Sequence, residues 1–206
     1  MEQAEGLDEG EILREILHAV RDTPEGVYHP GEDSFLMLDA ISGLPFEGKQ
    51  VLDLGTGSGI LGLYCSLRGA RVTLADIEES AVRHAVKAAR LLRVECKAIV
   101  SDLFSKISDQ FDFVLFNPPY LPSARIMDSA VDGGPAGRTI IERFLRELPH
   151  HLGKGGTAFL LISSLNEPAS LVRQHPEFYF STVTTRPLFF EELQVLSLRL
   201  RETFPS

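Results

Sequence analysis

The pattern of apolar and polar positions along the chain predicts an α/β domain. Short apolar runs bounded by turn residues predict strands, and longer stretches with apolar residues three or four positions apart predict helices. The predicted strands are residues 50–54, 71–75, 96–100, 111–116 and 157–162, followed by an antiparallel ribbon of residues 178–184 and 193–199. The predicted helices are residues 11–21, 35–41, 60–67, 80–92, 139–152 and 169–175, with the glycines at 153–156 ending the helix before them. Strands that alternate with helices are typical of a mostly parallel sheet.

The fourth predicted strand runs into a stiff polar turn formed by Asn117, Pro118, Pro119 and Tyr120. Proline has no N–H and a fixed φ, and a residue that precedes proline avoids the helical region. The carbonyls of Asn117 and Pro118 and the amide oxygen of Asn117 are therefore left as acceptors outside any hydrogen-bond ladder. A rigid group of acceptors suits a planar NH2 group, and we interpret the turn as the place where such a group is held.

The first predicted strand carries Asp53 and is followed by a glycine loop and a helix; the loop is Gly55-Thr56-Gly57-Ser58-Gly59. Glycines permit a tight turn and the close approach of a ligand at a helix N-terminus. The next strand leads to Asp76, at about the ~20-residue interval at which such units place a carboxylate on ribose hydroxyls, although Asp76 alone would also suit a helix N-cap. Because the charge of Asp53 would repel a phosphate, the pattern favours S-adenosylmethionine, which carries an ammonium and a sulfonium, over a dinucleotide.

Three further segments carry candidate residues. Asp102 and Leu103 follow the third strand at the same sheet edge, where they can face an adenine, and Asp102 can equally cap a short turn. The polar loop 27–34 leads into a helix whose predicted N-cap is Asp33 or Ser34. Residues 122–138 are rich in glycine and follow the acceptor turn directly, so we interpret them as a substrate-gripping lid, with disorder without function as the alternative.

Composition limits the partners of this 206-residue chain. Its net charge of −9 argues against unaided binding of nucleic acid, because that affinity comes largely from Lys and Arg on phosphates. Cys65 and Cys96 lack the paired spacing of metal ligands and are predicted to be buried reduced thiols, and no metal site is expected. No apolar run is long enough to span a bilayer, and the acidic start has no apolar segment of a signal peptide, so a cytoplasmic location is predicted.

Together these segments resemble the class I S-adenosylmethionine-dependent methyltransferases. More narrowly, the chain resembles the HemK/PrmC family, which methylates the glutamine of the Gly-Gly-Gln motif in peptide-chain release factors. The resemblance is carried by residues 28–35 (Tyr-His-Pro-Gly-Glu-Asp-Ser-Phe), 53–59 (Asp-Leu-Gly-Thr-Gly-Ser-Gly) and 117–120 (Asn-Pro-Pro-Tyr). Residues 133–138, Gly-Gly-Pro-Ala-Gly-Arg, are similar to that family's Gly-Gly-x-x-Gly-Arg loop. His29 stands where the short archaeal and eukaryotic branch usually has Glu.

The resemblance implies a Rossmann-like class I methyltransferase fold of the α/β class. We expect a seven-stranded, mostly parallel sheet with a C-terminal antiparallel strand and helices on both faces. Fewer than thirty residues precede Tyr28, as in the short branch, which implies a helical extension over residues 1–26 and one methyltransferase domain over 27–206. Members of that branch commonly pair with a small zinc-binding activator subunit, and we expect it to add a strand at the sheet edge formed by residues 96–100.

The resemblance also assigns the site. The expected catalytic residues are Asn117, Pro118, Pro119 and Tyr120. The expected residues that bind S-adenosylmethionine, or its product S-adenosylhomocysteine, are Asp33, Asp53, Gly55, Thr56, Gly57, Gly59, Asp76, Ile77, Asp102, Leu103 and Asn117.

Two alternatives to glutamine methylation stay open at this point. The Asn-Pro-Pro-Tyr turn is shared with adenine-N6 and guanine-N2 methyltransferases of nucleic acids, so a flipped base is an alternative acceptor. The other alternative is an adapter that has kept the fold and lost catalysis, against which the intact Asn117 and Asp53 argue.

Overall fold

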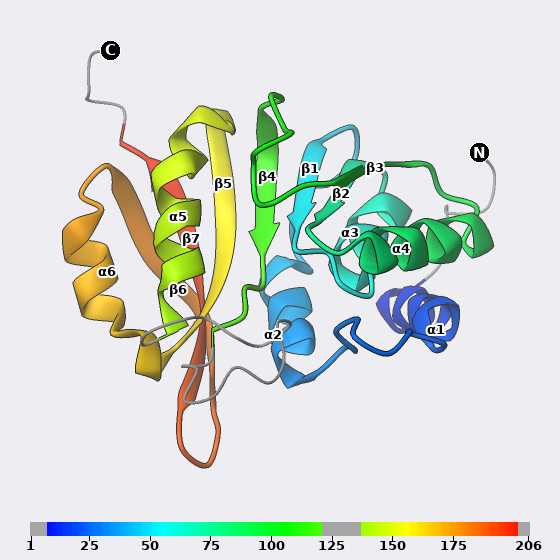
Figure 1. The fold of residues 1–206 in the computed structure, drawn as a ribbon, viewed down its shortest axis with the longest axis horizontal. Coiled ribbons are helices and arrows are strands. Elements are labelled where there is room, and N and C mark those ends of the chain that lie inside the picture. Colours follow the sequence, from blue (N-terminus) through cyan, green and yellow to red (C-terminus); the bar gives the residue numbers. More distant parts are fainter. Residues whose placement is uncertain (1–7, 121–136, 202–206) are drawn as a thin grey trace.

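A seven-stranded sheet forms the centre of the molecule, with the strand order β3-β2-β1-β4-β5-β7-β6 (Figure 1). The computed structural model describes residues 8–120 and 137–201. The strands are β1 (Gln50–Leu54), β2 (Arg71–Asp76), β3 (Cys96–Val100), β4 (Phe111–Phe116), β5 (Leu152–Ser163), β6 (Phe178–Pro187) and β7 (Glu192–Leu200). β1 to β5 are parallel, and β7 lies antiparallel between β5 and β6. The expected fold class is confirmed.

Helices cover both faces of this sheet. They are α1 (Glu9–Val20), α2 (Glu32–Ile41), α3 (Ile60–Leu67), α4 (Glu79–Leu91), α5 (Thr139–Glu147) and α6 (Pro168–Gln174). Successive residues of β5 point to opposite faces, so Phe159 and Leu161 pack with α1 to α4 while Leu160 and Ile162 pack with α5 and α6. Each face therefore has its own apolar core.

Helix α1 shares the first of these cores, although the sequence suggests a separate extension. Ile12, Ile16 and Val20 are buried against residues of α3 and α4. The side chain of Glu9 also accepts a hydrogen bond of 2.7 Å from the Tyr64 hydroxyl on α3. The domain boundary after residue 26 stays a prediction, and α1 is packed as part of the same body.

Several predicted element boundaries differ from the structure, and two of these differences have a clear physical reason. The helix predicted over residues 139–152 ends at Glu147, and β5 already begins at Leu152. A β-carbon at Gly156 would lie 2.8 Å from the Phe111 carbonyl oxygen, so the missing side chain allows β5 to approach β4 at the irregularity in their pairing. The glycines at 153–156 therefore mark a strand junction and not the end of a helix.

The start of α2 is the second correction. Its N-cap is Gly31, two residues before Asp33 and three before Ser34, and the Ser34 hydroxyl accepts the Gly31 N–H from within the first turn. Asp33 lies inside the helix, where its carboxylate accepts a hydrogen bond of 2.7 Å from the Tyr28 hydroxyl.

Strand register brings the predicted site residues together. Leu54 pairs with Ala75 on one side and with Phe116 on the other, and Asp76 pairs with Val100. The residues that follow these strands therefore emerge side by side at the carboxyl edge of the sheet, where open parallel sheets bind ligands. Across residues 8–120 and 137–201, no helix is both long and apolar enough to cross a membrane.

Candidate active site

A cavity of about 350 Å³ lies at this carboxyl edge. It is bordered by the loop before α2, the glycine loop, the ends of β2, β3 and β4, and the start of α5. The predicted residues that line it are Tyr120, Asp33, Gly55, Thr56, Gly57, Asp76, Ile77, Asp102, Leu103, Asn117, Pro118 and Pro119. Asp53 and Gly59 are not among the lining residues. The structure thus gathers in one place most of the residues that the sequence singled out from five separate segments.

The glycine loop is held against the end of β2. Gly57 has a positive φ of 50°, and its N–H donates a hydrogen bond of 2.9 Å to Asp76 Oδ2. The other oxygen of Asp76 accepts the Glu78 N–H at 2.9 Å, so the carboxylate is fixed by two backbone groups at the cavity wall. Both the ligand-facing and the helix-starting interpretation of Asp76 are consistent with this arrangement.

Gly59 has a packing role behind the cavity. It is the N-cap of α3 with a φ of 91°, a left-handed conformation that favours glycine. A β-carbon there would lie 3.0 Å from the β-carbon of Ala85, so the glycine lets α3 begin close to α4. Gly59 therefore contributes to ligand binding indirectly, because it fixes the position of the glycine loop.

Asp53 lies behind the glycine loop, buried with 1% exposure. Its Oδ2 accepts hydrogen bonds from the Thr56 hydroxyl at 2.6 Å and the Gly62 N–H at 2.9 Å. Burial raises the pKa of this carboxyl to about 6, against the lowering effect of these two hydrogen bonds. At neutral pH the carboxyl of Asp53 is therefore mainly ionised. Because Asp53 does not line the cavity, its charge acts on a ligand across Thr56 and the glycine loop, without direct contact.

Two apolar side chains border the cavity beyond Asp76. Ile77 is 62% exposed and Leu103 is buried, and they follow neighbouring strands, so a flat ring can lie between them. Leu103 has a positive φ of 44°, which is uncommon for a side chain of its size. The carboxylate of Asp102 forms an ion pair of 2.9 Å with Arg143 on α5. This pairing holds Asp102 in place at the rim.

Asn117 carries the most informative atom of the site. Its Oδ1 is buried and has no hydrogen-bond partner within the described residues. A buried acceptor left unpaired costs about 1–3 kcal/mol, and native proteins leave few of them. Since Asn117 lines the cavity, the missing partner is most simply an N–H group of a ligand.

One wall beside Asn117 is formed by Tyr28, Asp33 and Tyr120. The Tyr28 hydroxyl donates to Asp33, and Asp33 is 3% exposed although it lines the cavity. Burial raises the pKa of both tyrosine hydroxyls, and the nearby Asp33 carboxylate raises each further. Both phenols therefore stay protonated and can donate hydrogen bonds across the physiological range.

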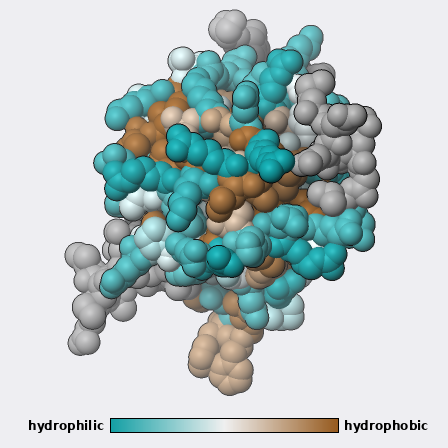
Figure 2. Space-filling view, turned by 90° about the vertical axis from the view of Figure 1, so that its right-hand side faces the viewer, coloured by the Kyte–Doolittle hydropathy of each residue, from teal (hydrophilic) through white to brown (hydrophobic). Residues whose placement is uncertain are grey.

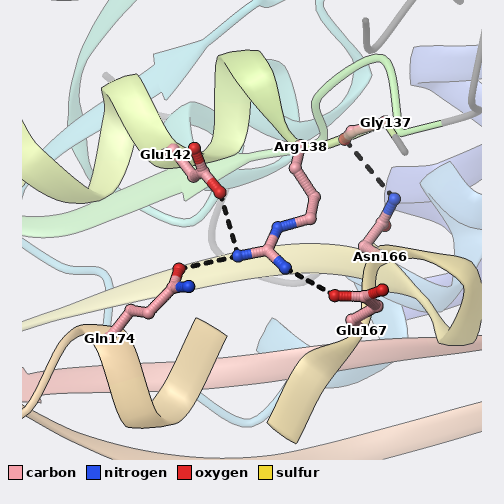
Figure 3. Close-up of polar contacts among 6 residues, drawn as sticks. All are labelled: Gly137, Arg138, Glu142, Asn166, Glu167 and Gln174. Carbon is pink, nitrogen blue, oxygen red and sulfur yellow. Dashed lines mark hydrogen bonds and ion pairs between the residues drawn. The ribbon is translucent and has the colours of Figure 1, made fainter. Parts of the chain in front are cut away.

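A buried arginine, which sequence reasoning did not single out as a site residue, joins the start of α5 to α6 (Figure 3). Arg138 forms ion pairs with Glu142 at 2.9 Å and Glu167 at 2.8 Å, and donates to Gln174 at 2.7 Å. Next to it, the Asn166 side chain donates to the carbonyls of Tyr120 at 2.7 Å and Gly137 at 3.4 Å. The sequence signal that could have indicated Arg138 was the Gly-Arg pair that ends the glycine-rich run of residues 133–138.

The remaining predictions have mixed outcomes. The proposed lid over residues 122–138 lies outside the described residues except for Gly137 and Arg138. Within residues 8–120 and 137–201, no cluster of three or more His, Cys, Asp or Glu side chains could hold a metal ion. Both cysteines are free thiols; Cys65 is buried, and Cys96 is only half-buried.

Comparison with known proteins places these features in a family. The model of the methyltransferase small domain matches residues 30–185. A Methanocaldococcus jannaschii protein that is named as an N5-glutamine methyltransferase is 37% identical over 180 residues, which are 83% of this chain and 90% of the relative. The mouse methyltransferase HEMK2 is 30% identical and covers 83% of this chain and 84% of its own length.

Two solved structures share the fold. The Encephalitozoon cuniculi (E. cuniculi) Mtq2–Trm112 complex, described as responsible for the methylation of the termination factor eRF1, matches with a TM-score of 0.69 and 27% identity over 85% of this chain and 99% of that chain. The Thermus thermophilus (T. thermophilus) 16S rRNA methyltransferase RsmC, solved with AdoMet and guanosine, matches with a TM-score of 0.66 and 26% identity over 84% of this chain and 44% of that chain. Since the family model covers more than half of the chain and the first relative nearly all of its own length, the chain belongs to the methyltransferase small domain family, within its HemK-related methyltransferases.

Proposed function

We propose that the chain is an S-adenosylmethionine-dependent methyltransferase that modifies the side-chain nitrogen N5 of the glutamine in the Gly-Gly-Gln motif of a peptide-chain release factor. The observation that carries this proposal is the unpaired, buried Oδ1 of Asn117 on the cavity wall. It marks a place for an N–H donor beside a cavity large enough for a small cofactor. The names of the relatives support glutamine as the source of that N–H.

The residues present fit S-adenosylmethionine. Asp76 offers a fixed carboxylate for ribose hydroxyls, Ile77 and Leu103 can enclose the adenine, and the charge of Asp53 favours a cationic ligand over a phosphate. When bound, the cofactor supplies an electrophilic methyl group on a positively charged sulfur. Asp33 and Gly57 lie on the same cavity and would border its methionine portion.

The acceptor turn would make the glutamine nitrogen reactive. A carboxamide nitrogen is a poor nucleophile because its lone pair is delocalised into the carbonyl. Acceptance of its two N–H groups by Asn117 Oδ1 and the Pro118 carbonyl would favour a pyramidal nitrogen and aim its lone pair. The nitrogen loses one proton to solvent after the new N–C bond forms, so no strong base is needed beside it. Tyr120 would exclude water from the pocket.

A partner subunit belongs to the proposal. Among the strands that the structure describes, β3 pairs only with β2 and forms one edge of the sheet, so an added strand could pair with its outer side. The similar Mtq2 protein was solved together with Trm112. We propose that a small zinc-binding activator adds a strand along Cys96–Val100, and that the enzyme acts in the cytoplasm, where translation terminates.

A nucleic-acid base is the second candidate acceptor, because RsmC shares the fold and was solved with guanosine. The net charge of −9 counts against it. A flipped guanine or adenine would present its amino group to the same two acceptors.

The deciding experiment uses the full chain co-expressed with its activator subunit and labelled S-adenosylmethionine. Release factors that carry Gly-Gly-Gln or Gly-Gly-Ala are compared, and tRNA and rRNA are included as alternative acceptors. The proposal expects label only in the Gly-Gly-Gln factor, located on the glutamine by mass spectrometry. Equal labelling of both factors, or label in RNA alone, would contradict it.

A further inference from the structure

Two phenylalanines are exposed at the turn between β6 and β7. Phe189 is 91% exposed and Phe190 is 86% exposed, and their rings pack against each other at right angles with centroids 4.5 Å apart. Figure 2 shows an apolar projection at the lower end of the molecule, where Figure 1 places this turn. Exposed aromatic pairs are rare on surfaces that contact only water, and such groups are enriched where proteins bind one another.

The turn is held by the body of the protein. The Leu188 N–H donates to the Glu191 carbonyl at 2.7 Å, and Leu188 packs against the apolar core that includes residues of α2. On one side Arg186 lies 3.4 Å from Asp39 on α2, and on the other the Glu192 N–H donates to the Ser164 hydroxyl at 3.0 Å. The two rings are therefore presented on an ordered support, which lowers the entropy cost of binding a partner.

The base of the turn also lies next to the acceptor site, because the Arg186 guanidinium donates to the Glu32 carbonyl at 3.4 Å and the adjacent Asp33 lines the cavity. The carboxylate of Glu191 is close enough to Tyr120 for its charge to raise the pKa of that phenol, after the larger effects of burial and Asp33. Glu191 Oε2 is buried and has no partner within the described residues. Because the Glu191 side chain as a whole is only partly buried, its carboxylate can turn toward a partner that covers the two rings.

The strand order separates this turn from the proposed activator edge. β3 is the first strand of the sheet and β6 the last, so an activator on β3 binds at the opposite side of the molecule from the β6 edge. The partner that must come close to Tyr120 is the one that presents the acceptor amide. The carboxylates of Glu191 and Glu192 beside the rings suit a partner that places a basic or N–H group next to its apolar patch.

We propose that Phe189, Phe190 and Glu191 form a docking site for the folded protein substrate. The two rings cover an apolar patch beside its glutamine loop, and the partly buried Glu191 carboxylate turns to accept a hydrogen bond from an N–H or cationic group of that substrate. This inference rests on the proposed function, and it adds a binding determinant outside the acceptor pocket.

The test compares steady-state kinetics of the wild-type complex with a Phe189→Ser/Phe190→Ser variant. Both side chains are exposed, so the fold is expected to be kept, and thermal unfolding checks this. The matched control is Tyr179→Ser, which removes an aromatic side chain that is 57% exposed at the other end of β6. We expect the double variant to raise the KM for the release factor by about tenfold or more, with kcat and cofactor affinity unchanged, and the control to behave as wild type.

The outcomes separate the two claims. A wild-type enzyme that leaves the release-factor glutamine unmodified contradicts the proposed function, and the docking site falls with it. A wild-type enzyme that is active, with a double variant whose KM lies within about twofold of wild type, overturns the docking site alone. A wild-type dimer that the double variant converts to a monomer in light scattering also overturns it, because the rings would then bind a second copy.

Discussion

The side-chain amide of Asn166 donates a hydrogen bond of 2.7 Å to the backbone carbonyl of Tyr120. Asn166 is fully buried, and its Oδ1 accepts the Ser163 N–H at 2.8 Å. The last residue of the Asn-Pro-Pro-Tyr turn is thereby tied to the end of β5. The geometry of the acceptor site depends on this neighbouring strand as well as on its own two prolines.

Replacement of Asn166 by Ala is expected to loosen the acceptor turn. It removes the partners of the Tyr120 carbonyl and the Ser163 N–H, and an unpaired buried group costs about 1–3 kcal/mol. We expect lower unfolding free energy in urea and a loss in kcat that exceeds any loss in cofactor affinity. The neighbouring Leu165→Ala, at a side chain that is 43% exposed, is the control. Equal losses in kcat and cofactor affinity would show that the turn is not the affected part.

Asn117→Ala is expected to separate stability from activity. The variant removes a buried oxygen that has no partner within the described residues, so the unfolding free energy should be unchanged or slightly higher. Loss of one oriented hydrogen-bonding group at the reacting atom commonly lowers kcat by about 10²–10³-fold. Calorimetric titration with S-adenosylhomocysteine should show that the site still forms. A variant with wild-type kcat would remove Asn117 from the mechanism.

Asp53 should make stability depend on pH in an unusual direction. Its pKa is about 6 in the folded protein against 3.8 for the free side chain, so the folded state holds the proton more tightly. This contribution is fully present below about pH 4 and is lost as the pH rises to about 6. The difference of about two pH units corresponds to roughly 3 kcal/mol.

The Asp53→Asn variant tests this contribution. An asparagine oxygen can still accept from Thr56 and Gly62 and carries no buried charge. The variant should therefore gain stability relative to wild type between pH 4 and pH 6 in urea denaturation. A difference that stays constant across this range would show that the carboxyl does not titrate there.

Arg138→Ala is expected to be strongly destabilising. The guanidinium is buried among Glu142, Glu167 and Gln174, and removal of one partner of a buried ion pair costs about 3–5 kcal/mol. Since both glutamates are partly exposed, the lower end of that range is expected. Arg83→Ala breaks the exposed ion pair with Glu79 on α4 and should cost less than about 1 kcal/mol. Similar losses in the two variants would contradict a structural role for Arg138.

Much of the fold follows from the sequence because local pattern and burial agree. The bounds of β1 and α3 were predicted correctly, since an apolar strand, a glycine loop and an apolar helix leave few other solutions. The glycines at 153–156 were misread because what requires them is the close approach of Phe111 on β4, which lies 45 residues before Gly156 in the sequence. No local pattern contains that contact.

The candidate site was predictable in place but not in detail. Parallel strands end at one edge, so Asp76 and Asn117 were expected to meet there, and they do. The position of Asp53 behind the loop, the ion pair of Asp102 with Arg143 and the contacts of Arg138 and Asn166 depend on side-chain packing across elements. The functional roles of these residues remain predictions.

Asn166 also binds the carbonyl of Gly137, and the left-handed Gly137 leaves no space for a β-carbon beside the Tyr120 carbonyl. Tyr120 and Gly137 are therefore held together by the scaffold, whatever sequence connects them. The fold itself brings the two ends of the connecting segment together. The entropic cost of closing such a loop grows only slowly with its length, so changes in the length of the segment should cost little stability. We therefore expect that insertions or deletions within residues 121–136 leave the relative position of Tyr120 and Gly137, and with it the acceptor turn, unchanged.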